Sequence, residues 1–136
     1  MTEYPQLLHT VIDTTTPREL AEFYRQLLGL RYRPGDEPPD AGADEVDWLV
    51  LVDHDGTRKL AFQQVDTLTP TTWPRHGVPM QLHVDFTVST VGELHRQRDR
   101  ALELGADLVL DRSADLDEPL FVFTDLSGHP FCIFVA

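Results

Sequence analysis

Two histidines, His9 and His83, each lie in an alternating apolar run, "LLHTVI" at 7–12 and "QLHVDF" at 81–86. An imidazole can bind a metal ion or transfer a proton near neutral pH. Side chains two residues apart on a strand point to the same face, so His83 is expected to share a face with Asp85. The two runs therefore predict two strands that each carry one histidine.

A shift of 74 residues aligns His9 with His83 and several further positions. The other matched pairs are Leu8 with Leu82, Thr16 with Thr90, Glu19 with Glu93, Leu20 with Leu94, and Leu28 with Leu102. In each half a strand-like run precedes Thr-x-x-Glu, the capping box whose side chains satisfy free amides at a helix start. We interpret this as a tandem duplication of one βαβββ unit, fused because neither copy could bury its sheet face alone.

Two helices follow from these boxes. Pro17 suits the first helical position, where its missing amide proton costs nothing. The apolar stripe from Leu20 to Leu28 predicts the first helix, and Gly29 can take a left-handed cap. A second, more exposed helix is expected at 91–104.

The remaining apolar runs predict strands. They lie at 30–33, 47–53, 59–65, 106–110, 120–125 and 130–136. Prolines and a glycine mark residues 66–80 as a connector. We therefore expect a single domain over 1–136, with module one at about 7–65 and module two at about 81–136.

Composition restricts the function. The 136 residues include 23 acidic and 11 basic side chains, a net charge of −12, which argues against a nucleic-acid partner and mildly favours a cationic ligand. The acidic residues 36–47 have the composition of a solvated loop without calcium-binding spacing. We expect no membrane segment, no signal peptide and a cytoplasmic location. The single cysteine, Cys132, cannot form an internal disulfide.

Two segments make the duplication more specific: "AEFYRQLLGL" at 21–30 and "DLSGHPFCIF" at 125–134. With the two βαβββ units, they resemble the vicinal oxygen chelate superfamily of glyoxalases, bleomycin-resistance proteins and extradiol dioxygenases, and within it the glyoxalase-like domain proteins. The resemblance covers about Leu7 to Val135. It implies an α+β fold in which an open, curved, eight-stranded mixed sheet surrounds a cavity and the helices pack outside.

The resemblance also implies metal ligands on the first and last strands of each module. By position, His9 and His83 match the first-strand ligands. Cys132 falls where the family has a glutamate, and Gln63 or Ala61 occupies the corresponding place in module one. Two imidazoles, an amide and a thiolate would favour zinc, iron or copper over magnesium.

This ligand set lacks the carboxylate that glyoxalase-type proton transfer and extradiol cleavage need beside the metal. Asp85 shares the face of His83, and Asp13 has the same parity as His9, so either is a candidate replacement. For the two histidines, the alternative is a pair of cavity-lining side chains without a metal. For Cys132, it is a small buried residue of the core.

Several aromatic residues are candidates for a ligand pocket, and core packing is the alternative for most of them. We predict substrate contacts from Trp48, Trp73 and Phe121, together with Asp85. Trp73 lies in the connector, where core packing is least expected, so a role as a pocket lid or subunit contact is a stronger alternative there than for the other aromatic residues.

Three functions fit the sequence. The first is a metal-assisted enzyme, a lyase, isomerase or dioxygenase, that acts on a small molecule. The second is a metal-free protein that binds a small molecule in the same cavity and dimerises, as bleomycin-resistance members do. The third is a degenerate or regulatory module whose cavity is filled by side chains. A homodimer is expected.

Overall fold

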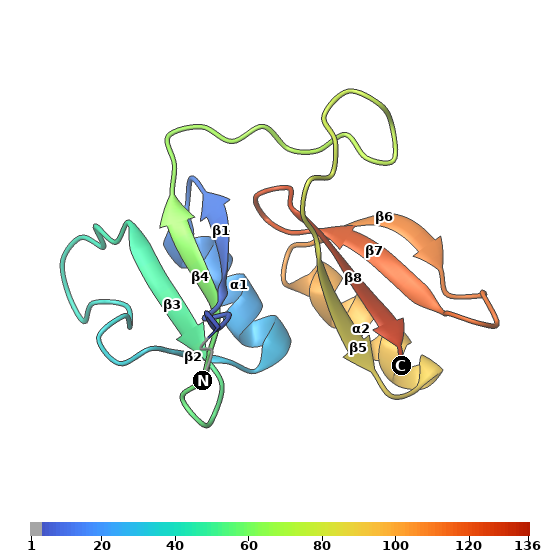
Figure 1. The fold of residues 1–136 in the computed structure, drawn as a ribbon, viewed down its shortest axis with the longest axis horizontal. Helices are drawn as coiled ribbons and strands as arrows, with labels where there is room; N and C mark the ends of the chain where they lie inside the picture. The colour runs from blue at the N-terminus through green and yellow to red at the C-terminus, as the bar shows by residue number, and fades with distance from the viewer. Residues whose placement is uncertain (1–3) are drawn as a thin grey trace. The chain divides into compact units, whose positions relative to one another are not determined.

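The structure is a computed structural model and describes residues 4–136. The chain divides into two compact units, Met1–Thr67 and Leu68–Ala136. Each unit has one helix and four strands in the order βαβββ (Figure 1). The predicted α+β class and the two repeated element orders are thus confirmed.

Unit 1 forms one open, mixed sheet of four strands. Its elements are β1 (Thr10–Thr14), α1 (Pro17–Leu28), β2 (Arg31–Tyr32), β3 (Trp48–Val52) and β4 (Arg58–Gln64). The strand order is β1-β4-β3-β2; β1 runs parallel to β4, and the other neighbours are antiparallel. The parallel pair is possible because α1 and two strands supply the long connection that a parallel crossover needs.

Unit 2 repeats this architecture. Its elements are β5 (Val84–Val88), α2 (Val91–Glu103), β6 (Asp107–Arg112), β7 (Leu120–Thr124) and β8 (Pro130–Val135). The strand order β5-β8-β7-β6 is that of unit 1, again with the first and last strands of the unit parallel. The eight strands expected from the sequence are therefore distributed over two mixed sheets.

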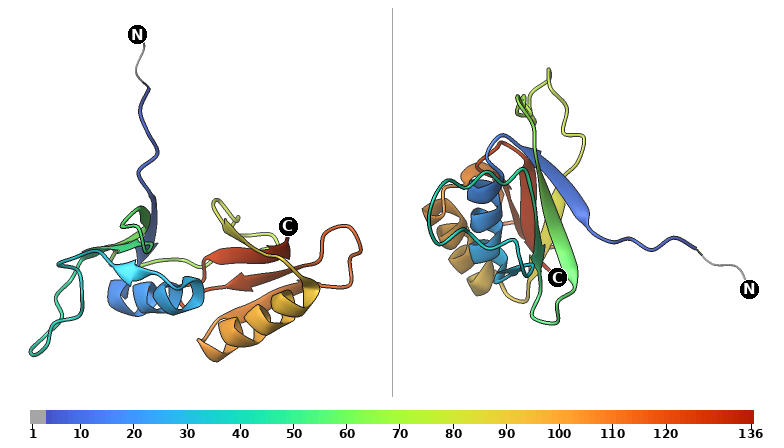
Figure 2. Two further views of the ribbon diagram at one scale, coloured as in Figure 1. Left: turned by 90° about the horizontal axis from the view of Figure 1, so that it is seen from below. Right: turned by 90° about the vertical axis from the view of Figure 1, so that its left-hand side faces the viewer.

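Each helix packs on one face of its own sheet (Figure 2). In unit 1 the ring of Tyr24 on α1 stacks on Phe62 of β4, with 5.9 Å between ring centroids. In unit 2 the ring of His95 on α2 meets Phe121 of β7 edge-on at 5.5 Å. We call the opposite face of each sheet its open face.

The alternation of side chains follows from these faces. In β1, Ile12 and Thr14 are buried on the helix side, whereas Val11 and Asp13 are exposed on the open face. His9 immediately precedes this strand. Strand parity thus gives His9 the same side as Val11, as the sequence predicts.

The two helix starts differ in their caps. At α2 the Thr90 hydroxyl accepts a hydrogen bond from the Glu93 amide at 3.1 Å, so that half of the predicted box is confirmed. At α1 the Thr16 side chain makes no capping hydrogen bond, so that prediction is wrong. The Thr14 hydroxyl instead accepts a hydrogen bond from the Thr16 amide at 3.0 Å and holds this corner by a different contact. Pro17 at the helix start and left-handed Gly29 at its end are as expected.

This difference predicts unequal effects of two matched substitutions. Thr90→Ala removes an N-cap hydrogen bond and should lower the free energy of unfolding by about 1 kcal/mol. Thr16→Ala removes no such bond and should change it by less than about 0.5 kcal/mol. Urea denaturation followed by circular dichroism measures both. Equal losses would show that the hydroxyl of Thr16 caps α1 after all.

Candidate metal centre on the open face of unit 2

The backbone register brings two of the predicted site residues together. Asp85 of β5 pairs with Cys132 of β8 in the parallel ladder, and Cys132 pairs with Val122 of β7 on its other side. Paired residues of neighbouring strands point to the same face of a sheet. Asp85 and Cys132 therefore lie side by side on the open face. Their neighbours in sequence, Phe86 and Phe131, pack together on the helix side.

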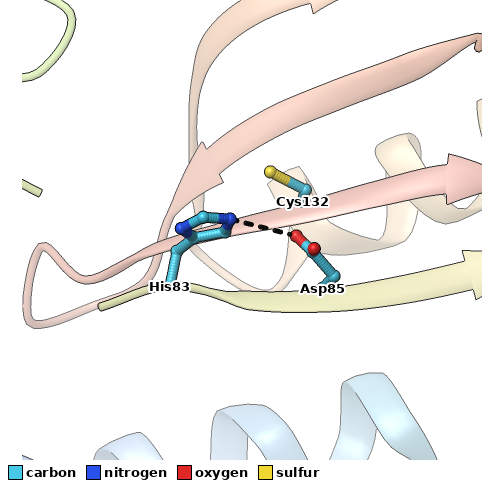
Figure 3. A group of neighbouring side chains, drawn as sticks. All are labelled: His83, Asp85 and Cys132. Atoms are coloured by element: carbon cyan, nitrogen blue, oxygen red, sulfur yellow. Dashed lines mark ion pairs between the residues drawn. The ribbon is translucent and has the colours of Figure 1, made fainter. Parts of the chain in front are cut away.

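His83 completes the group from the residue just before β5. Its Nε2 lies 3.4 Å from Oδ1 of Asp85. One ligand atom from each of His83, Asp85 and Cys132 lies within 4.8 Å of the other two. Figure 3 shows the imidazole and the carboxylate turned toward one another, with the thiol above them from the neighbouring strand. Among residues 4–136, no other group of three or more His, Cys, Asp or Glu side chains is arranged to hold a metal ion.

The thiol of Cys132 is held in its protonated form. Burial, followed by the negative charge of Asp85 and a hydrogen bond to it, raises the pKa of Cys132 to about 11. The carboxylate of Glu118 adds a smaller effect in the same direction. The sequence did not single out Glu118, because nothing in the spacing of the acidic segment that contains it connects it with β8.

His9 occupies the corresponding place in unit 1. Its ring meets Trp48 of β3 with 5.9 Å between centroids, and its Nδ1 is buried without a hydrogen-bond partner in the described part of the chain. Burial, then the positive charges of Arg58 and Arg33, lower the pKa of His9 below its ordinary value. His9 is therefore neutral at pH 7, which is the form that binds metals. Its predicted sharing of one metal with His83 stays a prediction.

Gln63 and Ala61 are the two alternatives for the ligand position of unit 1 that corresponds to Cys132. Asp13 of β1 pairs with Gln63 of β4, and Val11 pairs with Ala61, all on the open face. Gln63 is exposed, whereas Ala61 is fully buried and offers no ligand atom. Gln63 therefore stays the candidate ligand of this strand, with Asp13 as its neighbour.

The predicted aromatic contacts lie in three different environments. Trp48 is half-buried on the open face of unit 1, where it packs against the buried cluster of Val50, Val52 and Ala61. Trp73 is half-buried in the connector, and its amide donates a hydrogen bond to the Thr71 hydroxyl at 3.1 Å.

Phe121 is fully buried on the helix side, under His95 and Arg98 of α2. Strand alternation places its ring on the face opposite the group of His83, Asp85 and Cys132. Phe121 is therefore part of the core of unit 2, and we leave it out of the candidate site.

Comparison with known proteins identifies the family. The profile described as glyoxalase-like domain matches residues 9–134, nearly the whole chain. The chain belongs to the glyoxalase-like domain family. The resemblance inferred from the duplicated units and the two segments around Phe23 and Gly128 is thereby confirmed.

Solved structures share the fold of this glyoxalase-like domain at low sequence identity. A hypothetical protein from S. aureus is 17% identical, with 96% of this chain and 97% of that chain covered and a TM-score of 0.65. A glyoxalase/bleomycin resistance protein/dioxygenase family enzyme from Burkholderia phytofirmans is 15% identical, with 94% and 96% covered and a TM-score of 0.69. The fosfomycin resistance protein FosX from Listeria monocytogenes is 13% identical, with 98% and 93% covered and a TM-score of 0.68.

A variant of Listeria FosX was solved in complex with Mn(II) and dihydroxypropylphosphonic acid; it is 14% identical, with 96% and 90% covered and a TM-score of 0.67. The comparison with curated proteins gives no match. Within residues 4–136, the structure contains no helix with the length and apolar character to cross a membrane.

The donor atoms of this glyoxalase-like domain fit a transition metal. An imidazole, a carboxylate and a thiol are ligands that zinc and iron accept, whereas magnesium prefers an octahedron of oxygens. Ligand atoms within 4.8 Å of one another need only small side-chain movements to reach metal–ligand distances of roughly 2.0–2.3 Å. His83 and Asp85 keep 42% and 50% of their side-chain surface exposed, which leaves room for an entering ion.

Proposed function

We propose that this protein is a metal-dependent enzyme that acts on a small molecule at the open face of unit 2. The single observation that supports the proposal is the convergence of His83, Asp85 and Cys132 on one point. In this interpretation His83 and Cys132 hold a zinc or iron ion. Asp85 supplies the carboxylate that this chain lacks at the usual family positions. His9 and Gln63 stay predicted ligands, and the site in unit 2 does not require them.

Such an ion would act as a Lewis acid toward adjacent oxygens of the substrate. The chain itself supplies the ligand geometry. Asp85 contacts both the imidazole and the thiol, so its carboxylate can orient His83 and accept the S–H hydrogen bond of Cys132. The proton that Cys132 must lose to bind the ion would pass to solvent. Because the thiol must lose its proton to become a ligand, metal affinity should rise with pH. The reaction class proposed is that of a lyase, an isomerase or a dioxygenase.

Metal analysis of protein purified without an affinity tag tests this proposal. Protein loaded with zinc or iron(II) and then desalted should retain about one equivalent of metal. The double variant His83→Ala, Cys132→Ser should retain little or none. His54→Ala is the matched control, because the His54 imidazole lies exposed in the turn between β3 and β4, 3.5 Å from Oδ1 of Asp55, and its removal should leave the metal content unchanged. Similar substoichiometric metal in all three proteins would overturn the proposal.

A second candidate function is metal-free binding of a small molecule. It is favoured by the open face of unit 1, where Trp48 packs on the buried cluster and against His9. Under this function, ligands should quench Trp48 fluorescence equally with and without a chelator. Trp48→Phe should abolish that quenching, and Trp73→Phe, in the connector, should preserve it. A homodimer is part of both proposals and is measured by sedimentation.

A further inference from the structure

The cations of unit 1 are unequally neutralised. Four of its six arginine and lysine side chains pair with a carboxylate: Arg18 with Asp44, Arg25 with Glu22, Arg33 with Asp36 and Lys59 with Asp53. Arg31 and Arg58 form no ion pair with a carboxylate of residues 4–136. In a chain with 23 acidic side chains, two unneutralised guanidinium groups in one unit require an explanation.

The sheet places these two arginines on one face. Arg31 of β2 pairs with Val52 of β3, and Val52 pairs with Arg58 of β4. The register shifts between Leu51 and Val52, so Lys59 has no partner in the ladder and Arg58 is brought opposite Val52. Paired residues share a face, so the side chains of Arg31 and Arg58 leave the sheet on the same face as Val52, the open face of unit 1, from strands about 10 Å apart. Burial lowers the pKa of His9 most, and the charge of Arg58 is the next cause, which fits the placement of Arg58 on the face of His9.

Arg31 is also held in position. Its Nη2 donates hydrogen bonds to the carbonyl oxygens of Asp53 and His54, at 3.2 and 2.8 Å. Carbonyl oxygens fix the orientation of a guanidinium without cancelling its charge. A guanidinium has five N–H donors in a fork, so other donors stay available for an incoming oxyanion.

A hollow of about 600 Å³ adjoins this arginine. It is lined by Arg31 and Val52 with Glu22, Arg25, Tyr32, Pro34, Glu37, Pro38 and Gly56. Its two carboxylates are already engaged: Glu22 with Arg25 and the Tyr32 hydroxyl, and Glu37 with the Gly35 amide. The prolines and Val52 supply an apolar wall, so the hollow suits a molecule with both an apolar part and a charged end.

We propose that Arg31 and Arg58 form a binding site for the oxyanion of a small organic acid, a carboxylate or phosphonate, whose apolar part enters the adjoining hollow. This site lies within unit 1 and does not depend on the metal proposed for unit 2. It also reverses the expectation of a cationic ligand that the net charge of −12 suggested, because the two residues that pair with Val52 are both arginines without a carboxylate partner among residues 4–136.

Nuclear magnetic resonance titration with four matched probes tests the site. Benzoate and phenylphosphonate carry an oxyanion on an apolar ring, whereas benzyl alcohol is neutral and benzylamine is a cation. The two anions should shift the Nε–Hε signals of Arg31 and Arg58 and bind at least about tenfold more tightly than the other two probes, because charge-assisted hydrogen bonds are the stronger ones. Comparison of the affinities of benzoate and phenylphosphonate shows whether the site prefers a carboxylate or a phosphonate.

Variants locate the binding. Arg58→Gln should weaken benzoate and phenylphosphonate about tenfold, and Arg31→Gln should do the same. Arg31→Lys retains the charge without the fork and should have an intermediate effect. Lys59→Gln is the control: it removes the same charge one residue away, from a side chain already paired with Asp53. Equal binding of benzyl alcohol and benzoate, no binding of either anion at millimolar concentration, or an equal loss in Lys59→Gln would each overturn the proposal.

Discussion

Iodoacetamide should alkylate Cys132 of the chelator-treated protein roughly ten to a hundred times more slowly at pH 8 than it alkylates an unperturbed thiol. Only the thiolate reacts, and burial with the nearby Asp85 carboxylate raises the pKa of Cys132 to about 11. At pH 8 the thiolate is then roughly one part in a thousand. The expected factor of roughly ten to a hundred is smaller than the loss of thiolate alone would give, because a more basic thiolate is intrinsically more nucleophilic. The rate should increase about tenfold per pH unit and level off only near pH 11.

The sign of the pKa shift also fixes its effect on stability. The folded thiol has the higher pKa, so protonated Cys132 favours the folded chain, and this contribution is fully present below the ordinary pKa of the thiol. It is lost as the pH rises from that value toward about 11, because deprotonation then costs more in the folded chain than in the unfolded one. Over this pH range, the melting temperature of the protein should therefore fall relative to that of Cys132→Ser.

Two variants separate the causes of the shift. Asp85→Asn keeps the volume of the side chain but removes its charge, so the midpoint of alkylation should move to lower pH and the rate at pH 8 should increase several-fold. Glu118→Gln should have the same direction and a smaller size, because Glu118 makes the last of the contributions. An alkylation midpoint at the ordinary thiol value, unchanged in Asp85→Asn, would contradict the arrangement in Figure 3.

The fold was predictable because its signals are local. The apolar stripe of α1, the left-handed Gly29 after it and the alternation in β1 each involve residues a few positions apart. The cap of α1 shows the limit of such signals. Thr16 matches the capping-box pattern as well as Thr90 does, but the hydroxyl of buried Thr14 binds the Thr16 amide, and no spacing rule anticipates that competition.

The candidate site was predictable to a smaller extent. Strand parity alone puts Asp85 on the face of His83, and the family resemblance pointed to Cys132. Their contact depends on the register between β5 and β8, which lie far apart in sequence and are paired through a parallel ladder. Parity gives the face of a side chain and leaves the register between distant strands open.

Parity also fails at the bulge of β4. Simple alternation from Ala61 and Gln63 would place Arg58 on the helix side, with Leu60. Lys59 has no partner in the strand ladder, and this extra residue reverses the alternation. Arg58 therefore shares the open face with Val52 and Arg31. The arginine pair was therefore not accessible from the sequence, and the total charge of the chain suggested a ligand of the opposite sign.

The largest effect on stability is expected from Phe123→Ala. Phe123 of β7 is fully buried, and its ring stacks on Phe131 of β8 with 5.0 Å between centroids and meets Phe121 at 6.1 Å. Truncation removes this contact area and leaves a cavity, which costs about 3–5 kcal/mol. Small domains are stable by only about 5–15 kcal/mol, so unit 2 should lose a large part of its stability. Urea denaturation followed by far-ultraviolet circular dichroism measures the loss.

Phe134→Ala is the matched control for this truncation. Phe134 lies in the same sheet but on the open face, where it pairs with Thr87 and Leu120 and is only half-buried. Its replacement removes less buried surface and should cost about 1–2 kcal/mol. A smaller loss for Phe123→Ala than for Phe134→Ala would mean that the core of unit 2 lies on the Cys132 face of the sheet. The helix face would then be the exposed one, and the metal ligands proposed here would be buried among apolar side chains.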